Sequence, residues 1–200
     1  MSEISQIGAE PCAGIVIETK DLILRPWEDR DRAPMAAIQG DPLVRRYFPR
    51  IMTPQQVDDD IDLARIKLRE NGFHVQAAEH KETGELAGLL GLAIIPDFIR
   101  EAIPSRPVVE IGWVLARRFW GMGLAPQGAL AWLDFAWSID MPEVIATTAA
   151  INQQSRRVMQ KIGMRYDPSD DYQRPTFEGP HPSKAHVVYR IANPNNGAGS

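Results

Sequence analysis

The stretch VVEIGWVLARRFWGMGLAPQGALAWLDFAW, residues 108–137, constrains the fold most, because a strand pattern runs into two close glycines and a helix pattern leaves them. Glycines at a strand-to-helix turn let the backbone approach a ligand closely, and the first turn of a helix offers unpaired N–H groups to an anion. By itself the turn is equally compatible with phosphate binding and with a tight turn whose glycines serve packing. The local pattern therefore predicts a strand–turn–helix unit and leaves its ligand open.

The common nucleotide motifs do not match this turn. No Gly-Lys-Ser/Thr follows the glycines, so a P-loop nucleotidase is unsupported. The spacing of Gly121, Gly123 and Gly128 does not match G-x-G-x-x-G, and Asp140 precedes the next strand instead of ending it. A dinucleotide-binding unit is therefore a weak reading.

The rest of the chain predicts strands and helices in alternation. The helix that begins with Thr53-Pro54-Gln55-Gln56 has a capping-box signature and an apolar face at Val57, Ile61, Ala64 and Leu68. The other expected helices cover residues 28–39, 121–139 and 152–163, and the expected strands cover residues 15–25, 73–79, 85–95, 108–115, 144–151 and 185–191. A proline-bounded loop spans 96–107. Early meanders followed by alternation predict an α/β (α+β type) fold, a mixed sheet with helices on its faces.

Length and charge narrow the class of protein. Two hundred residues predict one domain at 15–192, with an N-terminal extension at 1–14 and a polar flexible tail at 193–200. The net charge of −4 argues against a nucleic-acid partner, and the longest apolar run, 86–95, is too short to span a membrane. The first ten residues lack an apolar run, and the histidines show no metal spacing. We expect a cytoplasmic monomer or homodimer without a metal.

Two motifs in order resemble the GCN5-related N-acetyltransferase (GNAT) family, and specifically its RimJ/RimL-like branch of ribosomal-protein-alanine acetyltransferases. Trp120-Gly121-Met122-Gly123-Leu124-Ala125 is similar to the family's Gln/Arg-x-x-Gly-x-Gly/Ala turn, with the tryptophan that this branch commonly has. About 30 residues later, NQQSRRVMQKIGM at 152–164 is similar to the branch's N-x-x-S-x-R-V-M-x-K-I/L-G-M helix. The resemblance implies the GNAT fold: a strongly bent sheet of six or seven strands with about four helices.

The resemblance also implies a co-substrate and the residues that hold it. Acetyl-CoA would lie where the strand before the glycines splays from the strand after them, and its acetyl group would pass to a primary amine of a protein N-terminus or a small molecule. The implied contacts are Trp113, Val114, Leu115, Trp120, Gly121, Met122, Gly123, Leu124, Ala125, Pro126 and Asn152. Asn152 also predicts a helix N-cap.

Transfer to an amine needs a base, because free alkyl amines are mostly protonated at neutral pH. Glu110 is the first candidate, since apolar neighbours in its strand would raise its pKa; Glu178 ranks lower, and a strand-edge ion pair is the alternative for Glu110. The usual tyrosine acid of the family is replaced by Met159, so Ser155 is the candidate donor to the departing sulfur. Ser155 also suits a plain role at a helix start.

Two other functions fit the same residues. A non-catalytic acyl-CoA-binding sensor on the same fold is favoured by Met159, and an unrelated nucleotide-binding protein is the second alternative. Acceptor specificity is expected in residues 98–106, around Tyr47 and in residues 172–181.

Overall fold

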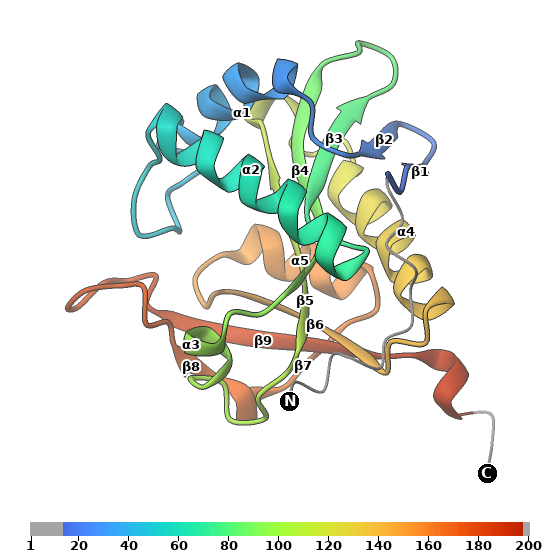
Figure 1. Ribbon diagram of the computed structural model, residues 1–200. Coiled ribbons are helices and arrows are strands. Elements are labelled where there is room, and N and C mark those ends of the chain that lie inside the picture. Colours follow the sequence, from blue (N-terminus) through green and yellow to red (C-terminus); the bar gives the residue numbers. More distant parts are fainter. Residues whose placement is uncertain (1–13, 198–200) are drawn as a thin grey trace.

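A single bent sheet forms the centre of the molecule in the computed structural model, which describes residues 14–197 (Figure 1). Within those residues nine strands follow the order β1-β2-β3-β4-β5-β6-β9-β7, and β8 pairs with β9. The strands are β1 Ile17–Glu18, β2 Leu22–Arg25, β3 Gln76–His80, β4 Leu86–Ile94, β5 Val109–Leu115, β6 Glu143–Ala149, β7 Arg165–Tyr166, β8 Tyr172–Gln173 and β9 Ala185–Ala192. Only β5 and β6 pair in parallel among these, which confirms a mixed sheet.

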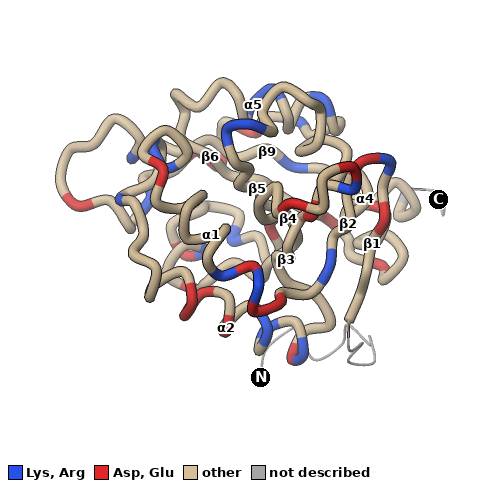
Figure 2. Tube along the Cα trace, turned by 90° about the horizontal axis from the view of Figure 1, so that it is seen from above, with Lys and Arg blue, Asp and Glu red and all other residues tan. Residues whose placement is uncertain are grey.

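Helices cover the sheet from both sides. Those of residues 14–197 are α1 Arg32–Gln39, α2 Pro54–Asn71, α3 Asp97–Arg100, α4 Leu124–Ser138 and α5 Gln153–Lys161, with short 3-10 turns between some of them. The α1–α2 pair lies on one side of the central strands, while α4 and α5 lie on the other (Figures 1 and 2). α4 also packs directly on β4 and β5, and it touches α5. The layered α/β architecture is therefore confirmed.

The α2 helix forms as its sequence predicts. The Thr53 hydroxyl accepts a 3.3 Å hydrogen bond from the Gln56 amide, and the Gln56 side chain accepts a 3.0 Å bond from the Thr53 amide. Pro54 occupies the first turn, and Gly72 ends the helix at φ 77°. The predicted apolar face is buried: Val57, Ile61, Ala64 and Leu68.

Several element boundaries differ from the prediction. Residues 15–25 form two short antiparallel strands, β1 and β2, because Gln127 of α4 holds the intervening turn by accepting hydrogen bonds from Thr19 Oγ1 and the Asp21 amide. The helix predicted at 121–139 begins at Leu124, since the left-handed Gly123 is its N-cap. The sheet gains strands over the expected six or seven through the two-residue segments β1, β7 and β8.

The predicted loop 96–107 contains the one-turn helix α3 and a small second core. Ile99 and Ile103 are buried there with Ile95, Ile145, Tyr172 and Val188. Ser105 donates from its backbone and its hydroxyl to Asp170, which ties the loop to the region before β8. This loop is therefore a packed support beneath the sheet.

The chain ends lie at the margin of what the structure describes. The predicted extension at 1–14 falls outside the described residues except for residue 14, and so do residues 198–200 of the predicted tail. Asn193 is buried and donates to the Met141 carbonyl oxygen, and a 3-10 turn follows at Pro194–Gly197. Among residues 14–197, no helix combines the length and the apolar character needed to cross a membrane.

Candidate functional site

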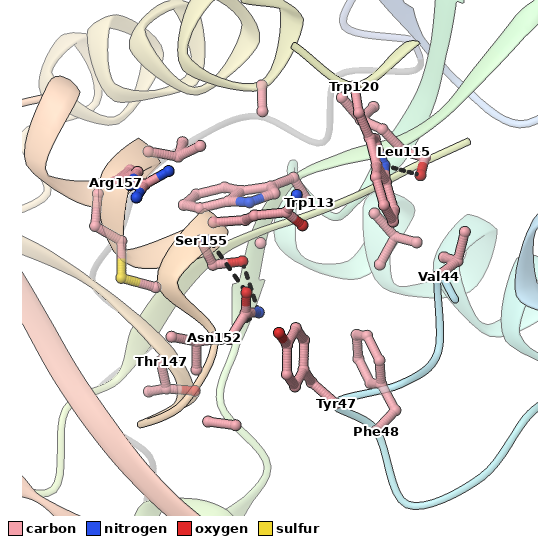
Figure 3. Close-up of a pocket in the computed structure, with 18 of the residues that line it drawn as sticks. Val44, Tyr47, Phe48, Trp113, Leu115, Trp120, Thr147, Asn152, Ser155 and Arg157 are labelled. Carbon is pink, nitrogen blue, oxygen red and sulfur yellow. Dashed lines mark hydrogen bonds between the residues drawn. The ribbon is translucent and has the colours of Figure 1, made fainter. Parts of the chain in front are cut away.

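The site begins where β5 and β6 separate. These strands pair at one register position, Glu110 opposite Ile145, so the rest of β5 has no strand partner on that side. A cavity of about 510 Å³ occupies the gap and is lined on its two strand walls by residues 110–115 and 147–149. Figure 3 shows Trp113 and Leu115 on one wall and Thr147 on the other. The expected splay between the strand before the glycines and the strand after them is thus present.

The glycine turn lies at one end of the cavity. Gly121 and Gly123 both have φ 80°, a left-handed conformation that side chains with a Cβ rarely adopt. A Cβ added to either glycine would meet no atom within 4 Å, so the need for glycine comes from backbone conformation and not from crowding inside the protein. The amides of Leu124 and Ala125 open α4 and have no intrahelical acceptor. The turn therefore offers N–H groups to an anion.

Most of the expected cofactor contacts line this cavity. They are Trp113, Val114, Leu115, Trp120, Gly121, Gly123, Leu124, Ala125, Pro126 and Asn152. Met122 is the exception, because it does not line the cavity and its side chain is 51% exposed. Trp120 donates from Nε1 to the Leu115 carbonyl oxygen at 2.8 Å, which fixes the indole at the end of β5 (Figure 3).

Basic residues that sequence reasoning did not single out also line the cavity. Arg157 and Lys161 both come from α5. Arg46 lies over the Trp120 ring at 5.5 Å and donates to the Gln154 side chain at 2.7 Å, so it connects the segment before α2 with α5. By contrast Arg117 pairs with Asp41 and Arg118 with Glu85, and neither reaches this cavity.

Asn152 and Ser155 form one hydrogen-bonded unit at the start of α5. Asn152 is the N-cap, as predicted, and its Oδ1 accepts from the Ser155 amide at 3.3 Å. Its Nδ2 donates to Ser155 Oγ at 3.0 Å (Figure 3). The same Nδ2 also donates to Thr148 Oγ1 at 2.9 Å. Because Ser155 Oγ accepts from Asn152, its own hydrogen remains available to a group in the cavity. Capping and cavity lining therefore coexist in these two residues.

Glu110 lies on β5 at the opposite end of the cavity from the glycine turn. Burial raises the pKa of its carboxyl group, while the positive charge of Arg174 and a hydrogen bond with Thr147 act in the lowering direction without cancelling it. Tyr172 joins the same cluster through its hydroxyl, which donates to Thr147 Oγ1 at 3.4 Å and accepts from Arg174 Nη1 at 3.2 Å. Glu178, the second candidate base, is exposed and does not line the cavity.

The remaining wall near Glu110 comes from three separate segments. Tyr47 and Phe48 precede α2, Phe177 follows β8, and His186 lies in β9. The expected acceptor regions around Tyr47 and at 172–181 thus contribute side chains, whereas none of residues 98–106 lines the cavity. No sequence signal marks the place of His186 at the cavity.

The donor groups suit an elongated ligand with an anionic end. The helix start with its open amides and the nearby cationic side chains match an anionic end of a ligand. The unpaired edge of β5 matches an arm that carries amides. No group of three or more His, Cys, Asp and Glu side chains within residues 14–197 is arranged to hold a metal ion.

Comparison with known proteins agrees with this geometry. The family model described as the acetyltransferase (GNAT) domain matches residues 21–165. The uncharacterized protein YkkB of Bacillus subtilis is 33% identical over 150 residues, covering 74% of this chain and 84% of its own. A GNAT-family acetyltransferase from Bacillus anthracis has a similar structure, with a TM-score of 0.71 at 22% identity over 90% of this chain and 99% of that one. Ribosomal-protein-S5-alanine acetyltransferase from Vibrio fischeri gives 0.67 at 13%, over 90% and 98%.

The structural likenesses, both at low identity, show the shared fold. The family model and the Bacillus subtilis relative extend the match to the sequence over most of the chain. The chain belongs to the GNAT acetyltransferase family and is an acetyl-CoA-dependent acetyltransferase.

Proposed function

We propose that residues 15–192 form an N-acetyltransferase domain of the RimJ/RimL-like branch that acetylates a primary amine by direct attack in a ternary complex. The acceptor amine belongs to a protein N-terminus or a small molecule. One observation carries the proposal: Glu110 and Ser155 face the same cavity as the glycine turn. The motif at 152–164 and the name of the Vibrio fischeri neighbour support the branch.

The cofactor end of the proposed site binds by backbone groups. The Leu124 and Ala125 amides would donate to the pyrophosphate, and Arg157 and Lys161 would add positive charge in the same cavity. The β5 backbone from Trp113 to Leu115 lacks a partner on the β6 side and can pair with the amides of the pantetheine arm. Bound acetyl-CoA supplies an activated acetyl thioester.

Glu110 would act as the general base. A primary ammonium must lose a proton before its nitrogen can attack, and a base works best when its pKa approaches the working pH. Burial raises the pKa of Glu110 in that direction, and the charge of Arg174 and a hydrogen bond with Thr147 oppose the rise. The carboxylate then takes the proton directly or through a bridging water.

Ser155 would assist the departing thiolate. Its Oγ accepts from Asn152 Nδ2, which orients the hydroxyl and leaves its hydrogen for the sulfur. Thr148 holds the same Asn152 amide from the other side, so the direction of the hydroxyl does not depend on Ser155 alone. In this proposal Ser155 donates a hydrogen bond to the sulfur at the chemical step.

A non-catalytic acyl-CoA sensor is the alternative that the sequence leaves, and the match to an acetyltransferase family model argues against it. The observation that favours it is Met159, which is buried at the cavity wall in the position where many family members have a tyrosine acid. A thioether cannot donate a proton, so the sensor would keep the binding surface and lack the acid. Turnover separates the two functions.

Binding and turnover should be measured on the same preparation. Acetyl-CoA should raise the melting temperature while ATP and NAD should not, because the glycine turn matches neither nucleotide motif. Release of CoA thiol, together with the mass of the product, should then be followed over small amines and N-terminal peptides. Stabilisation by acetyl-CoA without transfer to any amine would replace the enzyme by the sensor.

A further inference from the structure

Arg174 lies at the acceptor end, and its charge has no carboxylate partner in the part of the chain that the structure describes. It follows β8, lines the cavity and is half-buried. Its side chain donates to the Tyr172 hydroxyl at 3.2 Å, and no carboxylate of residues 14–197 lies within salt-bridge distance of it. Arg190, on neighbouring β9, shows the usual arrangement, since Glu143, Asp167 and Asp170 surround it. A half-buried guanidinium without a counter-ion is costly unless a ligand supplies one.

Glu110 does not fill this role. It feels the charge of Arg174 without forming an ion pair with it, and its own burial favours the uncharged acid. The base role also requires the carboxyl group to take up a proton in each cycle, so it cannot be a permanent counter-ion. The cavity therefore keeps a net positive charge beside the proposed base.

His186 adds an independent sign of a polar ligand at the same place. Its side chain lines the cavity, the residue is only 7% exposed, and neither ring nitrogen has a hydrogen-bond partner within residues 14–197. Burial and then the charge of Arg174 lower its pKa to about 3, against a weak opposing effect of the Ser183 backbone. The imidazole is therefore neutral at ordinary pH and can accept a hydrogen bond.

The rings of Tyr172 and Phe177 hold this imidazole in position. Their centroids lie 5.5 Å and 6.2 Å from that of His186. Tyr172 also contacts Arg174, so the guanidinium and the imidazole are held by the same tyrosine. Anion-binding and hydrogen-bond-accepting groups thus lie together around Glu110.

We propose that the acceptor carries an anionic group close to its amine, that Arg174 binds this group, and that His186 accepts a hydrogen bond from the acceptor. The inference rests on the proposed acetyl transfer and narrows its substrate class. A free amino acid and a peptide with an acidic residue next to its N-terminus share this chemistry. Planar, bidentate pairing with a carboxylate is what a guanidinium provides.

The test compares acceptors in which a carboxylate is replaced by its neutral amide, at a pH-matched concentration of free amine. One arm uses small amino acids and their carboxamides; the other uses N-terminal peptides with Asp or Asn at the second position. For each pair, kcat/KM is measured with the wild-type protein, Arg174→Gln and Arg174→Lys. We expect the wild type to prefer the anionic member by about 10-fold or more, a typical worth of one hydrogen bond to a charged group. Arg174→Gln should remove this preference, which is the ratio of kcat/KM for the two members, because a changed pKa of Glu110 affects both members alike and cancels in the ratio.

Further variants control for folding and for general charge. Arg165→Gln removes an exposed arginine of β7 that does not line the cavity, and it should keep the preference. Arg174→Lys keeps the positive charge but lacks the planar guanidinium with its paired N–H donors. Its preference for the anionic member should lie between those of the wild type and Arg174→Gln. His186→Phe keeps an aromatic ring without the ring nitrogens, and it should lower kcat/KM for both members of a pair. Melting temperatures establish that every variant is folded.

Three results would overturn the inference. Equal loss on both members, with a displaced acid limb, would mean that Arg174 acts through Glu110. Weaker acetyl-CoA binding in Arg174→Gln would make it a cofactor contact. The third result comes from a binding titration, in which both members of each acceptor pair are added to CoA-saturated protein. Equal affinity for the two members would show that Arg174 does not form an anion site. If the wild type acetylates no acceptor, the proposed function is contradicted. The titration still tests the anion site in that case, because it measures binding and not turnover.

Discussion

Replacing Ser155 by Ala separates catalysis from helix capping, because the two roles of this residue use different atoms. The amide of Ser155 donates to Asn152 Oδ1, and that bond survives the substitution. The hydroxyl accepts from Asn152 Nδ2 and, by our proposal, donates to the departing sulfur. Ser155→Ala therefore removes the second function and retains the cap.

The expected stability cost is small. Asn152 Nδ2 keeps its 2.9 Å bond to Thr148 Oγ1, so one of its two N–H groups remains satisfied and the other turns to water. A single lost hydrogen bond of this kind costs about 1 kcal/mol. For a chain of this length that lowers the melting temperature by about 2–4 °C.

The expected catalytic cost is larger than the stability cost would explain. A thiolate is a fairly good leaving group, so the help of a donor is modest, and we expect a drop of about 10- to 100-fold in the transfer step, or about 1.4–2.7 kcal/mol of barrier. Acetyl-CoA affinity should be nearly unchanged. The assay is a single-turnover rate of acetyl transfer, with the melting temperature of the same sample measured beside it.

Thr148→Val is the matched control. It removes the other acceptor of Asn152 Nδ2 and leaves the Ser155 hydroxyl in place, so it should show a similar loss of stability with a much smaller change in rate. Equal rate losses in the two variants would assign the effect to the positioning of Asn152. An unchanged rate in Ser155→Ala, with a lowered melting temperature, would refute the donor role.

Three further predictions concern other parts of the molecule. Gly123→Val forces a β-branched residue to φ 80°, at about 1–2 kcal/mol, and should weaken acetyl-CoA binding at least tenfold by calorimetry, whereas an unchanged affinity in the folded variant would exclude this turn as the pyrophosphate site. Glu110→Gln should lower kcat/KM by about 10²–10⁴-fold at neutral pH. Since burial raises the pKa of Glu110, wild-type activity should decline as the pH falls through that raised value, and the variant should lose this acid limb; a wild-type profile would contradict the base. Gly91→Ala places a Cβ 2.7 Å from the Val75 Cα and should cost about 1–3 kcal/mol in unfolding experiments, while Gly112→Ala, opposite it in β5, meets no atom within 4 Å and should not.

Local chemistry made much of this fold predictable. The capping box at Thr53, the glycine turn and the Asn152 cap are each complete within a few residues, and the structure forms all three. Such signals act before any long-range contact exists, so they can be read from a short segment of sequence. The order of strands and helices followed from the same kind of pattern.

The acceptor end could not be predicted in this way. Glu110, Arg174 and His186 lie in three strands or loops separated by many residues, and only the pairing of β9 with β6 and β8 brings two of these segments together. His186 has the pattern of an ordinary strand residue, because nothing nearby in sequence marks the cavity it faces. The Arg46–Gln154 contact likewise joins residues 108 positions apart.

Because β5 and β6 pair at one register position, the central sheet consists of two halves that are joined there by one short contact. A ligand whose amides form hydrogen bonds with the open edge of β5 would extend the contact between the two halves, as an inserted strand would. The amide hydrogens of Trp113 and Leu115, which point away from β4, should then exchange with solvent more slowly in the liganded protein. Cofactor binding would in this way complete the sheet, and the rigidity of one half relative to the other would depend on the bound cofactor.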